Sequence, residues 1–177
     1  YMEGCGVKKD EKDAIEYYEH AVDLGNSNAM VNLALAYANG TGVLQNKREA
    51  VRLYKKAVDL NNRDAMFNLG LVYESSGAHK DEAVRLYKQA AELEHSGAMC
   101  KLGQACKEGA GVSKDAAAAL DWYQQAADLE NAEAMCALGG CYATGDGVPQ
   151  DMAEAIRLYR QGADLGDTGA MTNLGLC

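Results

Sequence analysis

Residues 134–169 read AMCALGGCYATGDGVPQDMAEAIRLYRQGADLGDTG, and this stretch is one unit of a repeat that fills the chain. Related copies begin with Ala-Met at residues 29, 65 and 98, and the front of another begins at residue 170. Successive starts are 36 residues apart, except that the interval from 65 to 98 is 33. Self-similarity at a fixed period of this size is the sequence signature of stacked structural units. We therefore expect residues 1–177 to form a single repeat array.

The array contains full copies and a part of a copy at each end. The full copies are residues 29–64, 65–97, 98–133 and 134–169, and the partial copies are residues 1–28 and 170–177. The first residues, YMEGCGV, align with Tyr37–Val43, so the sequence starts near the end of a helix whose front is not in it. Two interpretations remain open: the sequence is a fragment of a longer array, or chains stack end to end and continue the array.

The first half of each copy predicts a helix with one buried face. The pattern consists of Met135, Leu138, Gly139 and Tyr142. The other full copies repeat it with a small residue at the position of Gly139, and the copy that begins at residue 98 has Cys106 in place of the Tyr. Spacings of three and four residues place these side chains on or near one helical face. The small residue after the Leu lets a neighbouring helix come close. We interpret the repeated Met as core between repeats, not as an adaptable Met-rich binding surface.

A Gly-x-Gly-Val turn ends this helix, as in Gly145–Val148, and an Asp or Asn begins the next one. Glycine suits the left-handed position that follows a helix end. Asn46 with Glu49, and Asp151 with Glu154, resemble capping boxes. In the 33-residue copy, residues 74–82 replace this turn. The shortening is either a tolerated loop deletion or a kink that shapes a binding groove.

The second half of each copy predicts a second helix, in which small residues seven positions apart flank a bulky pair. Ala155, Leu158, Tyr159 and Gly162 show this arrangement. Together with the first helix and the turn, it gives the pattern A-x-x-x-L-G-x-x-Y-x-x-G-x-G-V-x-x-D-x-x-x-A-x-x-x-Y-x-x-A-A. This pattern resembles the Sel1-like repeat, a relative of the tetratricopeptide repeat, over essentially the whole chain. The resemblance implies an all-α, right-handed superhelical solenoid of antiparallel helix-turn-helix repeats that acts as a binding scaffold and not as an enzyme.

The resemblance also nominates ligand-binding residues, because first helices line the concave face in tetratricopeptide arrays. The outward positions of the first helices are Val31, Asn32, Leu35, Asn39, Phe67, Asn68, Leu71, Lys101, Gln104 and Glu108, followed by Cys100, Cys136, Ala137 and Thr144. Asn32, Asn68 and Asn173 recur at one position, and a carboxamide both donates and accepts hydrogen bonds. We therefore expect either a ladder of Asn side chains that holds a peptide backbone or ordinary solvated helix residues. Lys101 interrupts the series and would meet an acidic group.

The charge of the chain restricts its partners. The net charge is −9 and the sequence pI is about 4.8, with basic residues scattered over the predicted helices. A nucleic-acid backbone requires a basic stripe, so we expect no nucleic-acid partner. The acidity favours protein segments with basic residues, or it serves solubility alone. No apolar run is long enough to cross a bilayer, so we expect no membrane insertion.

Six cysteines and three histidines raise the possibility of disulfides, a metal site or a catalytic thiol. Cys100 and Cys106 are about 9 Å apart along one predicted helix, and Cys136 and Cys141 about 7.5 Å, which does not suit a disulfide. Secreted members of the family carry disulfide cysteines in every copy, and this regularity is missing here. We expect free thiols and a reducing, cytoplasmic compartment. No C-x-x-C or recognisable catalytic motif occurs, so we expect no metal, no cofactor and no catalysis.

The sequence thus predicts a non-catalytic scaffold or adaptor that binds a protein or peptide segment on its concave face. The alternative is a self-associating array, in which the terminal repeats lack polar caps and form homo-oligomers or filaments through their ends. An enzyme or thiol redox protein is the remaining hypothesis.

Overall fold

The computed structural model describes residues 11–77 and 79–177, and this part of the chain is built from α-helices without strands. The helices are α1 Glu11–Asp23, α2 Ser27–Asn39, α3 Lys47–Asp59, α4 Arg63–Ser76, α5 Lys80–Glu92, α6 Ser96–Glu108, α7 Ala116–Asp128, α8 Ala132–Thr144, α9 Met152–Asp164 and α10 Thr168–Leu176. The all-α repeat fold is confirmed. Residues 1–10, which include Cys5 and Asp10, lie outside the described residues.

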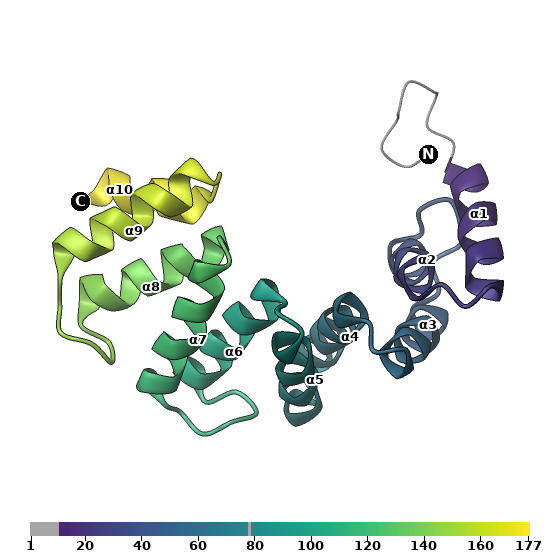
Figure 1. The fold of residues 1–177 in the computed structure, drawn as a ribbon, viewed down its shortest axis with the longest axis horizontal. Helices are drawn as coiled ribbons and strands as arrows, with labels where there is room; N and C mark the ends of the chain where they lie inside the picture. Colours follow the sequence, from purple (N-terminus) through teal and green to yellow (C-terminus); the bar gives the residue numbers. More distant parts are fainter. Residues whose placement is uncertain (1–10, 78) are drawn as a thin grey trace.

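The helices follow one another along an arc, with α1 at one end and α10 at the other (Figure 1). Each first helix packs against the second helix that follows it, giving the hairpins α2–α3, α4–α5, α6–α7 and α8–α9. Each second helix also contacts the first helix of the next hairpin. The helices α2 and α4 lie on the open side of the arc relative to α3 and α5 (Figure 1). The fold is a superhelical stack of hairpins.

The core is continuous along the arc. One cluster of buried side chains extends from Ile15 in α1 to Leu158 in α9, and a small second cluster joins α9 to α10. The repeat-position methionines belong to this core: Met30, Met66, Met99 and Met135 are at most 7% exposed. Their interpretation as core residues is confirmed for these four copies. Among the described residues no polar or charged residue is buried, so apolar contact between hairpins holds the array together.

The structure explains why both positions of the Gly-x-Gly-Val turn are occupied by glycine. The first, as at Gly109, follows the helix end with φ 74° and donates its N–H to the Ala105 carbonyl. The second approaches the start of the preceding second helix. A Cβ on Gly111 would lie 2.7 Å from the Lys80 carbonyl oxygen, and one on Gly42 would lie 2.7 Å from that of Glu11. A side chain at the second glycine would therefore push the loop away from the neighbouring repeat.

The second helices begin at the predicted Asn and Asp caps, but the capping boxes are only half formed. The Asn46 side chain accepts from the Glu49 N–H at 3.1 Å, as expected. The Glu49 carboxylate does not return to the Asn46 N–H, because that N–H donates to the Tyr37 carbonyl at 2.8 Å. Glu49 instead pairs with Arg52, and Glu154 with Arg157 in the same way. The reciprocal half of the predicted capping box is therefore wrong.

The 33-residue copy keeps its hairpin but lacks the loop that packs on the preceding repeat. Helix α4 ends at Gly77, which has φ 69°, and α5 begins after His79, whose side chain makes no capping hydrogen bond. In the neighbouring copies the loop covers Ile15 and Val84, which are about 5% and 6% exposed. The equivalent Val51 in α3 is only half-buried. Leu120, the equivalent residue of α7, is also half-buried although the Gly145–Val148 turn is present, so the short turn alone does not decide how far this position is covered.

Candidate functional site: the inner face of the first helices

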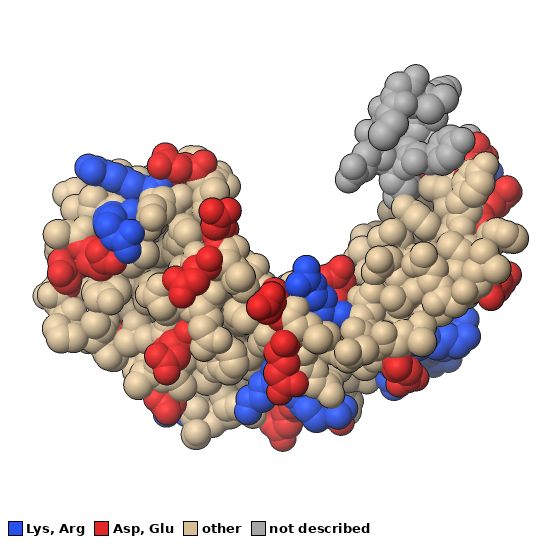
Figure 2. All heavy atoms as spheres, viewed as in Figure 1, with Lys and Arg blue, Asp and Glu red and all other residues tan. Residues whose placement is uncertain are grey.

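The first helices bury one side in the core and leave the other side accessible. Leu35, Leu71 and Gln104 occupy equivalent positions on α2, α4 and α6; Leu35 is 38% exposed and the other two are half-buried. Asn32, Asn39 and Glu108 are exposed on the same helices, and Phe67, Asn68 and Lys101 are half-buried. The arc is hollowed on its open side, with basic and acidic side chains adjacent at its middle (Figure 2). We refer to this side of α2, α4 and α6 as the inner face.

One repeat position among the candidates, occupied by Val31, Phe67, Cys100 and Cys136 in successive copies, does not belong to the inner face. Val31 is 6% exposed and Cys100 is 4% exposed, so both are core residues and not ligand contacts. The reason is visible at the equivalent Phe67, whose ring stacks on His95, the residue that caps the start of the next first helix α6, with centroids 4.4 Å apart. At the equivalent Cys136, the sulfur accepts a long hydrogen bond from Asn173 of α10. This position therefore packs successive first helices together.

The Asn series does not form a uniform ladder. Asn32 is exposed, whereas the Asn68 side-chain amide donates to the Asp64 carbonyl of its own helix at 2.7 Å. Asn173 donates to the Cys136 sulfur at 3.5 Å, and Lys101 interrupts the series as the sequence already showed. Two of the three Asn side chains thus already donate a hydrogen bond to an acceptor within the array.

A polar network occupies the middle of the inner face, where α4 meets α6. Tyr87 donates its hydroxyl to Glu74 Oε2 at 3.0 Å, and Lys101 Nζ lies 3.7 Å from the same oxygen. Lys101 also donates to Gln104 Oε1 at 3.4 Å, and Gln104 donates to Glu108 Oε1 at 3.0 Å. Burial raises the pKa of the Tyr87 hydroxyl, as does the neighbouring Glu74 carboxylate, so the hydroxyl stays protonated and donates. The network therefore holds these side chains in fixed directions.

Two members of this region were missed by the sequence reasoning, and both depart from the repeat pattern. Glu74 stands where the other copies have Ala38, Lys107 and Ala143. His95 caps α6 by accepting from the Ala98 N–H at 3.1 Å, where three copies have Asn and one has Asp. A comparison of the copies position by position for such exceptions would have found them.

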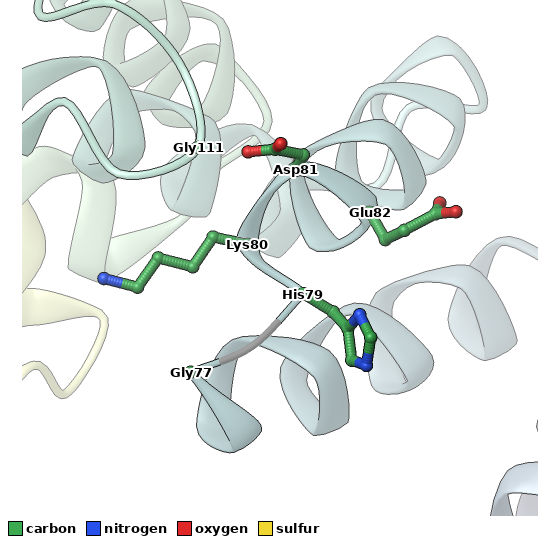
Figure 3. A pocket seen from close by; sticks show the side chains of 6 residues that line it. All are labelled: Gly77, His79, Lys80, Asp81, Glu82 and Gly111. Carbon is green, nitrogen blue, oxygen red and sulfur yellow. The ribbon is translucent and has the colours of Figure 1, made fainter.

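Two cavities border the short turn. One, of about 240 Å³, is lined by Glu74, Tyr87 and Glu108 together with the first half of α5. The other, of about 350 Å³, lies between the start of α5 and Gly111 of the next copy (Figure 3). In this second cavity His79 and Lys80 point in different directions, and Asp81 and Glu82 do not converge with them (Figure 3). The first cavity adjoins the polar network, whereas the second does not gather a set of ligating groups.

The described cysteines are free thiols, and the environments of the four in α6 and α8 favour the protonated form. Cys100, Cys106 and Cys141 are buried, Cys136 is half-buried and Cys177 is exposed. Burial raises the pKa of Cys100 to about 12 and that of Cys136 to about 11. Burial also raises the pKa values of Cys106 and Cys141. A thiol acts as a nucleophile through its thiolate, so these four are poor nucleophiles at neutral pH.

Within residues 11–77 and 79–177, His, Cys, Asp and Glu side chains nowhere gather in a group of three or more that could hold a metal ion. In the same part of the chain, each helix is too short or too polar to span a bilayer.

Family comparisons identify the repeat unit. The Sel1 repeat model matches residues 1–26, 27–62, 96–131 and 132–167, and a tetratricopeptide repeat model matches residues 65–97. The Sel1 matches begin at the first residues of α2, α6 and α8, two residues before the predicted copy starts. The short copy is thus the one that resembles a tetratricopeptide repeat. No curated protein matches the chain.

Solved structures share the fold over nearly the whole chain. A Sel1 repeat protein from Oxalobacter formigenes is 36% identical with a TM-score of 0.92, covering 99% of this chain and 73% of that one. The protective antigen c5321 of uropathogenic Escherichia coli is 34% identical with a TM-score of 0.86, covering 98% of this chain and 38% of its own. The immunity protein Pa5087 of Pseudomonas aeruginosa shares the fold at 24% identity and a TM-score of 0.69, with 93% of this chain and 62% of that chain covered.

The helical hairpins, their glycine turns and these matches agree. Proteins built from Sel1 and tetratricopeptide repeats are generally non-catalytic scaffolds for protein–protein interaction. The chain belongs to the Sel1 repeat family.

Proposed function

We propose that this chain is a non-catalytic adaptor that binds a segment of a partner protein on its inner face. The observation that carries the proposal is the row of equivalent, accessible positions on successive first helices, from Leu35 through Leu71 to Gln104. A stack of hairpins repeats these positions along the arc, which suits an extended segment. The partner would contact several copies at once.

The side chains of this row change from apolar to polar along the arc, and this change indicates which residue types the partner segment presents. Leu35 and Leu71 offer apolar contact on α2 and α4, beside the exposed amides of Asn32 and Asn39. Such amides can donate to and accept from a peptide backbone. On α6 the row becomes polar, with Lys101 and Gln104 in the network described above. We therefore expect a segment with apolar side chains toward α2 and hydrogen-bonding side chains toward α6.

The acidity of the chain adds a preference for basic partners. The net charge is −9, and acidic side chains are scattered over the C-terminal half of the face seen in Figure 2. Complementary charge raises the rate of encounter and discriminates against acidic partners. A basic residue in the partner segment is therefore expected near Glu108, whose Oε2 has no partner among the described residues.

A peptide-display selection on residues 1–177 tests the proposal. Peptides enriched on the wild type are measured against the double variant Leu35→Ala, Lys101→Ala. We expect binding to weaken by roughly tenfold or more, about 1.4 kcal/mol, because both contacts are on the inner face. The matched control is Leu60→Ala, Lys55→Ala, which removes the same residue types from exposed positions in α3 and directly after it. Peptides that lose affinity equally on both variants, or not on the inner-face variant, contradict the proposal.

A further inference from the structure

A leucine at the junction between successive hairpins recurs along the array and is accessible to solvent. It directly follows the last residue of the second helix in each copy. Leu60 and Leu129 each lie between two hairpins of the described array, and they are 52% and 42% exposed. The equivalent Leu165 is 50% exposed, and Leu93 is half-buried. The exposure is therefore a property of this position in the repeat.

Acidic residues surround these leucines from Leu93 to Leu165. The three junctions, residues 92–97, 128–133 and 164–169, contain no Lys or Arg but seven acidic residues: Glu92, Glu94, Asp128, Glu130, Glu133, Asp164 and Asp167. None of the seven forms an ion pair with a Lys or Arg in the part of the chain that the structure describes. We call these three junctions the acidic edge.

The acidic edge follows one side of the stack. Each junction connects the end of a second helix with the start of the next first helix, so all junctions lie at the same ends of the antiparallel helices. The first helices α6, α8 and α10, which start at these junctions, contact one another in succession. Packed helices are about 8–10 Å apart, so successive leucines of the edge are spaced by about 10 Å.

This spacing decides which conformation of a partner segment fits the leucines. In an α-helix, residues seven positions apart share a face and are separated by about 10.5 Å. In an extended segment about 10 Å corresponds to three residues, whose side chains alternate and so do not share a face. A helix with an apolar side chain at every seventh position therefore matches the leucines, and basic residues beside that face match the carboxylates.

We propose that the acidic edge binds a basic amphipathic helix of a partner protein, with its apolar face against Leu129 and Leu165. The unpaired carboxylates attract the basic helix, and burial of the leucines holds it. Anionic lipid headgroups are repelled by the same carboxylates, so a membrane surface does not fit this edge. The surface is additional to the inner face, and the two proposals can fail separately.

A synthetic peptide of three heptads tests the proposal. It has Leu at the first position of each heptad, Lys at the positions beside that face and Ala elsewhere, and fluorescence anisotropy follows its binding to residues 1–177. We expect saturable binding of one peptide per chain that weakens with added salt, because salt screens the attraction. A peptide of the same composition in scrambled order, whose leucines do not share a face, should bind roughly tenfold more weakly. Equal binding of the two peptides overturns the proposal.

Leucine variants locate the contact on the chain. Leu129→Ala, Leu165→Ala should weaken binding of the ordered peptide by roughly tenfold or more, with unchanged helicity. The matched control is Leu44→Ala, Met152→Ala, which removes two exposed apolar side chains from the opposite ends of the hairpins. An equal loss on both variants, or no loss on the edge variant, contradicts binding at the acidic edge.

Charge variants separate the acidic edge from the net charge of the chain. Glu130→Gln, Glu133→Gln removes two carboxylates of the edge, whereas Glu16→Gln, Glu19→Gln removes two exposed carboxylates of α1. Both variants change the net charge equally, but only the first should weaken the ordered peptide at low salt. Equal weakening would show that the peptide responds to net charge alone, which overturns the proposal.

Two measurements exclude other arrangements. The inner-face variant Leu35→Ala, Lys101→Ala should bind the ordered peptide as the wild type does, and a loss there would place the helix on the inner face. In sedimentation velocity, self-association of the wild type that Leu129→Ala, Leu165→Ala abolishes would assign the acidic edge to a second copy of this chain. Either result overturns the proposal.

Discussion

The ring of Tyr87 lies directly against the backbone of Gly70. A Cβ atom on Gly70 would be 2.4 Å from Tyr87 Cε1, closer than any side chain tolerates without movement of the ring. Gly103 with Tyr123, and Gly139 with Tyr159, repeat this contact in the following hairpins. In these three hairpins the glycine therefore sets how closely the two helices approach each other, whereas α2 has Ala34 at the equivalent position.

The sign of the stability change on substitution of Gly70 should reveal this contact. We expect Gly70→Ala to destabilise the array by about 1 kcal/mol or more, because the added methyl group displaces the buried Tyr87 ring. Gly140→Ala is the control: its Cβ would meet only the Tyr159 hydroxyl at 3.8 Å, an ordinary van der Waals contact, so the gain in helix propensity should stabilise by up to about 1 kcal/mol. Urea unfolding of both variants measures the difference. Equal shifts of the two midpoints in the same direction would contradict the packing role of Gly70.

The Asn caps at the start of first helices also connect repeats. Asn62 accepts from the Ala65 N–H at 2.9 Å and donates to Asn28 Oδ1 at 2.7 Å in the preceding copy. Asn46 makes the equivalent cap on α3 at 3.1 Å, and this side-chain hydrogen bond stays within its own helix. Loss of a cap costs about 1 kcal/mol, so Asn62→Ala should cost more than Asn46→Ala. The two unfolding midpoints decide this, and a larger loss at Asn46 would refute the connecting role.

His95 makes the stability of the array depend on pH. Its Nδ1 accepts from the Ala98 N–H, and its Nε2 lies 3.6 Å from Asp64 Oδ1. Burial lowers the pKa of His95 below its usual 6.5; the Asp64 carboxylate opposes this shift, and the nearby Arg63 guanidinium adds to it. The cap requires an unprotonated Nδ1, because a protonated nitrogen cannot accept a hydrogen bond.

Because the folded-state pKa is lowered, the unfolded chain takes up a proton at His95 before the folded chain does. The contribution of His95 is therefore fully present above pH 6.5 and is lost as the pH falls through the folded-state pKa. His95→Asn restores the cap residue found at Asn62 and Asn131 and removes the titration. Unfolding midpoints of both proteins should diverge further, in favour of the variant, as the pH falls below 6.5. Parallel midpoints across that range would show that His95 does not contribute.

The environments of the cysteines predict a strong selectivity toward thiol reagents. Among the cysteines of residues 11–177, Cys177 should be alkylated first, since it is exposed, whereas Cys100 and Cys136 should react only when the array opens. Residue-by-residue mass spectrometry after a short alkylation pulse at neutral pH measures this. Rapid labelling of Cys100 in the folded protein would contradict both its burial and its raised pKa.

Periodicity in the sequence was sufficient to predict the hairpins, because each copy repeats the same buried face. The Met-x-x-Leu-Gly pattern placed Met135 and Gly139 correctly, and Gly145 ends its helix as expected. The same reasoning failed for Val31, because a position that points away from its own hairpin can still be covered by the next copy. Contacts between copies depend on the rotation from one hairpin to the next, which no single repeat encodes.

The polar network shows the other limit of sequence reasoning. Lys101 was expected to meet an acidic group of a ligand, and it lies 3.7 Å from Glu74 of the preceding copy. Glu74 lies in the last turn of α4, before the shortened turn, at a position where the repeat has no fixed residue type. Side chains that face each other across copies at such variable positions become visible only once the hairpins are stacked.

The most direct test of the central claim is to map a display-selected peptide onto residues 1–177 by amide chemical-shift perturbation. Binding to the inner face predicts that the largest shifts fall on α2, α4 and α6, around Leu35, Leu71 and Gln104, while the outer residues Lys55 and Arg85 stay unchanged. Shifts concentrated on α3, α5 and α7, with the inner positions unaffected, would contradict the account.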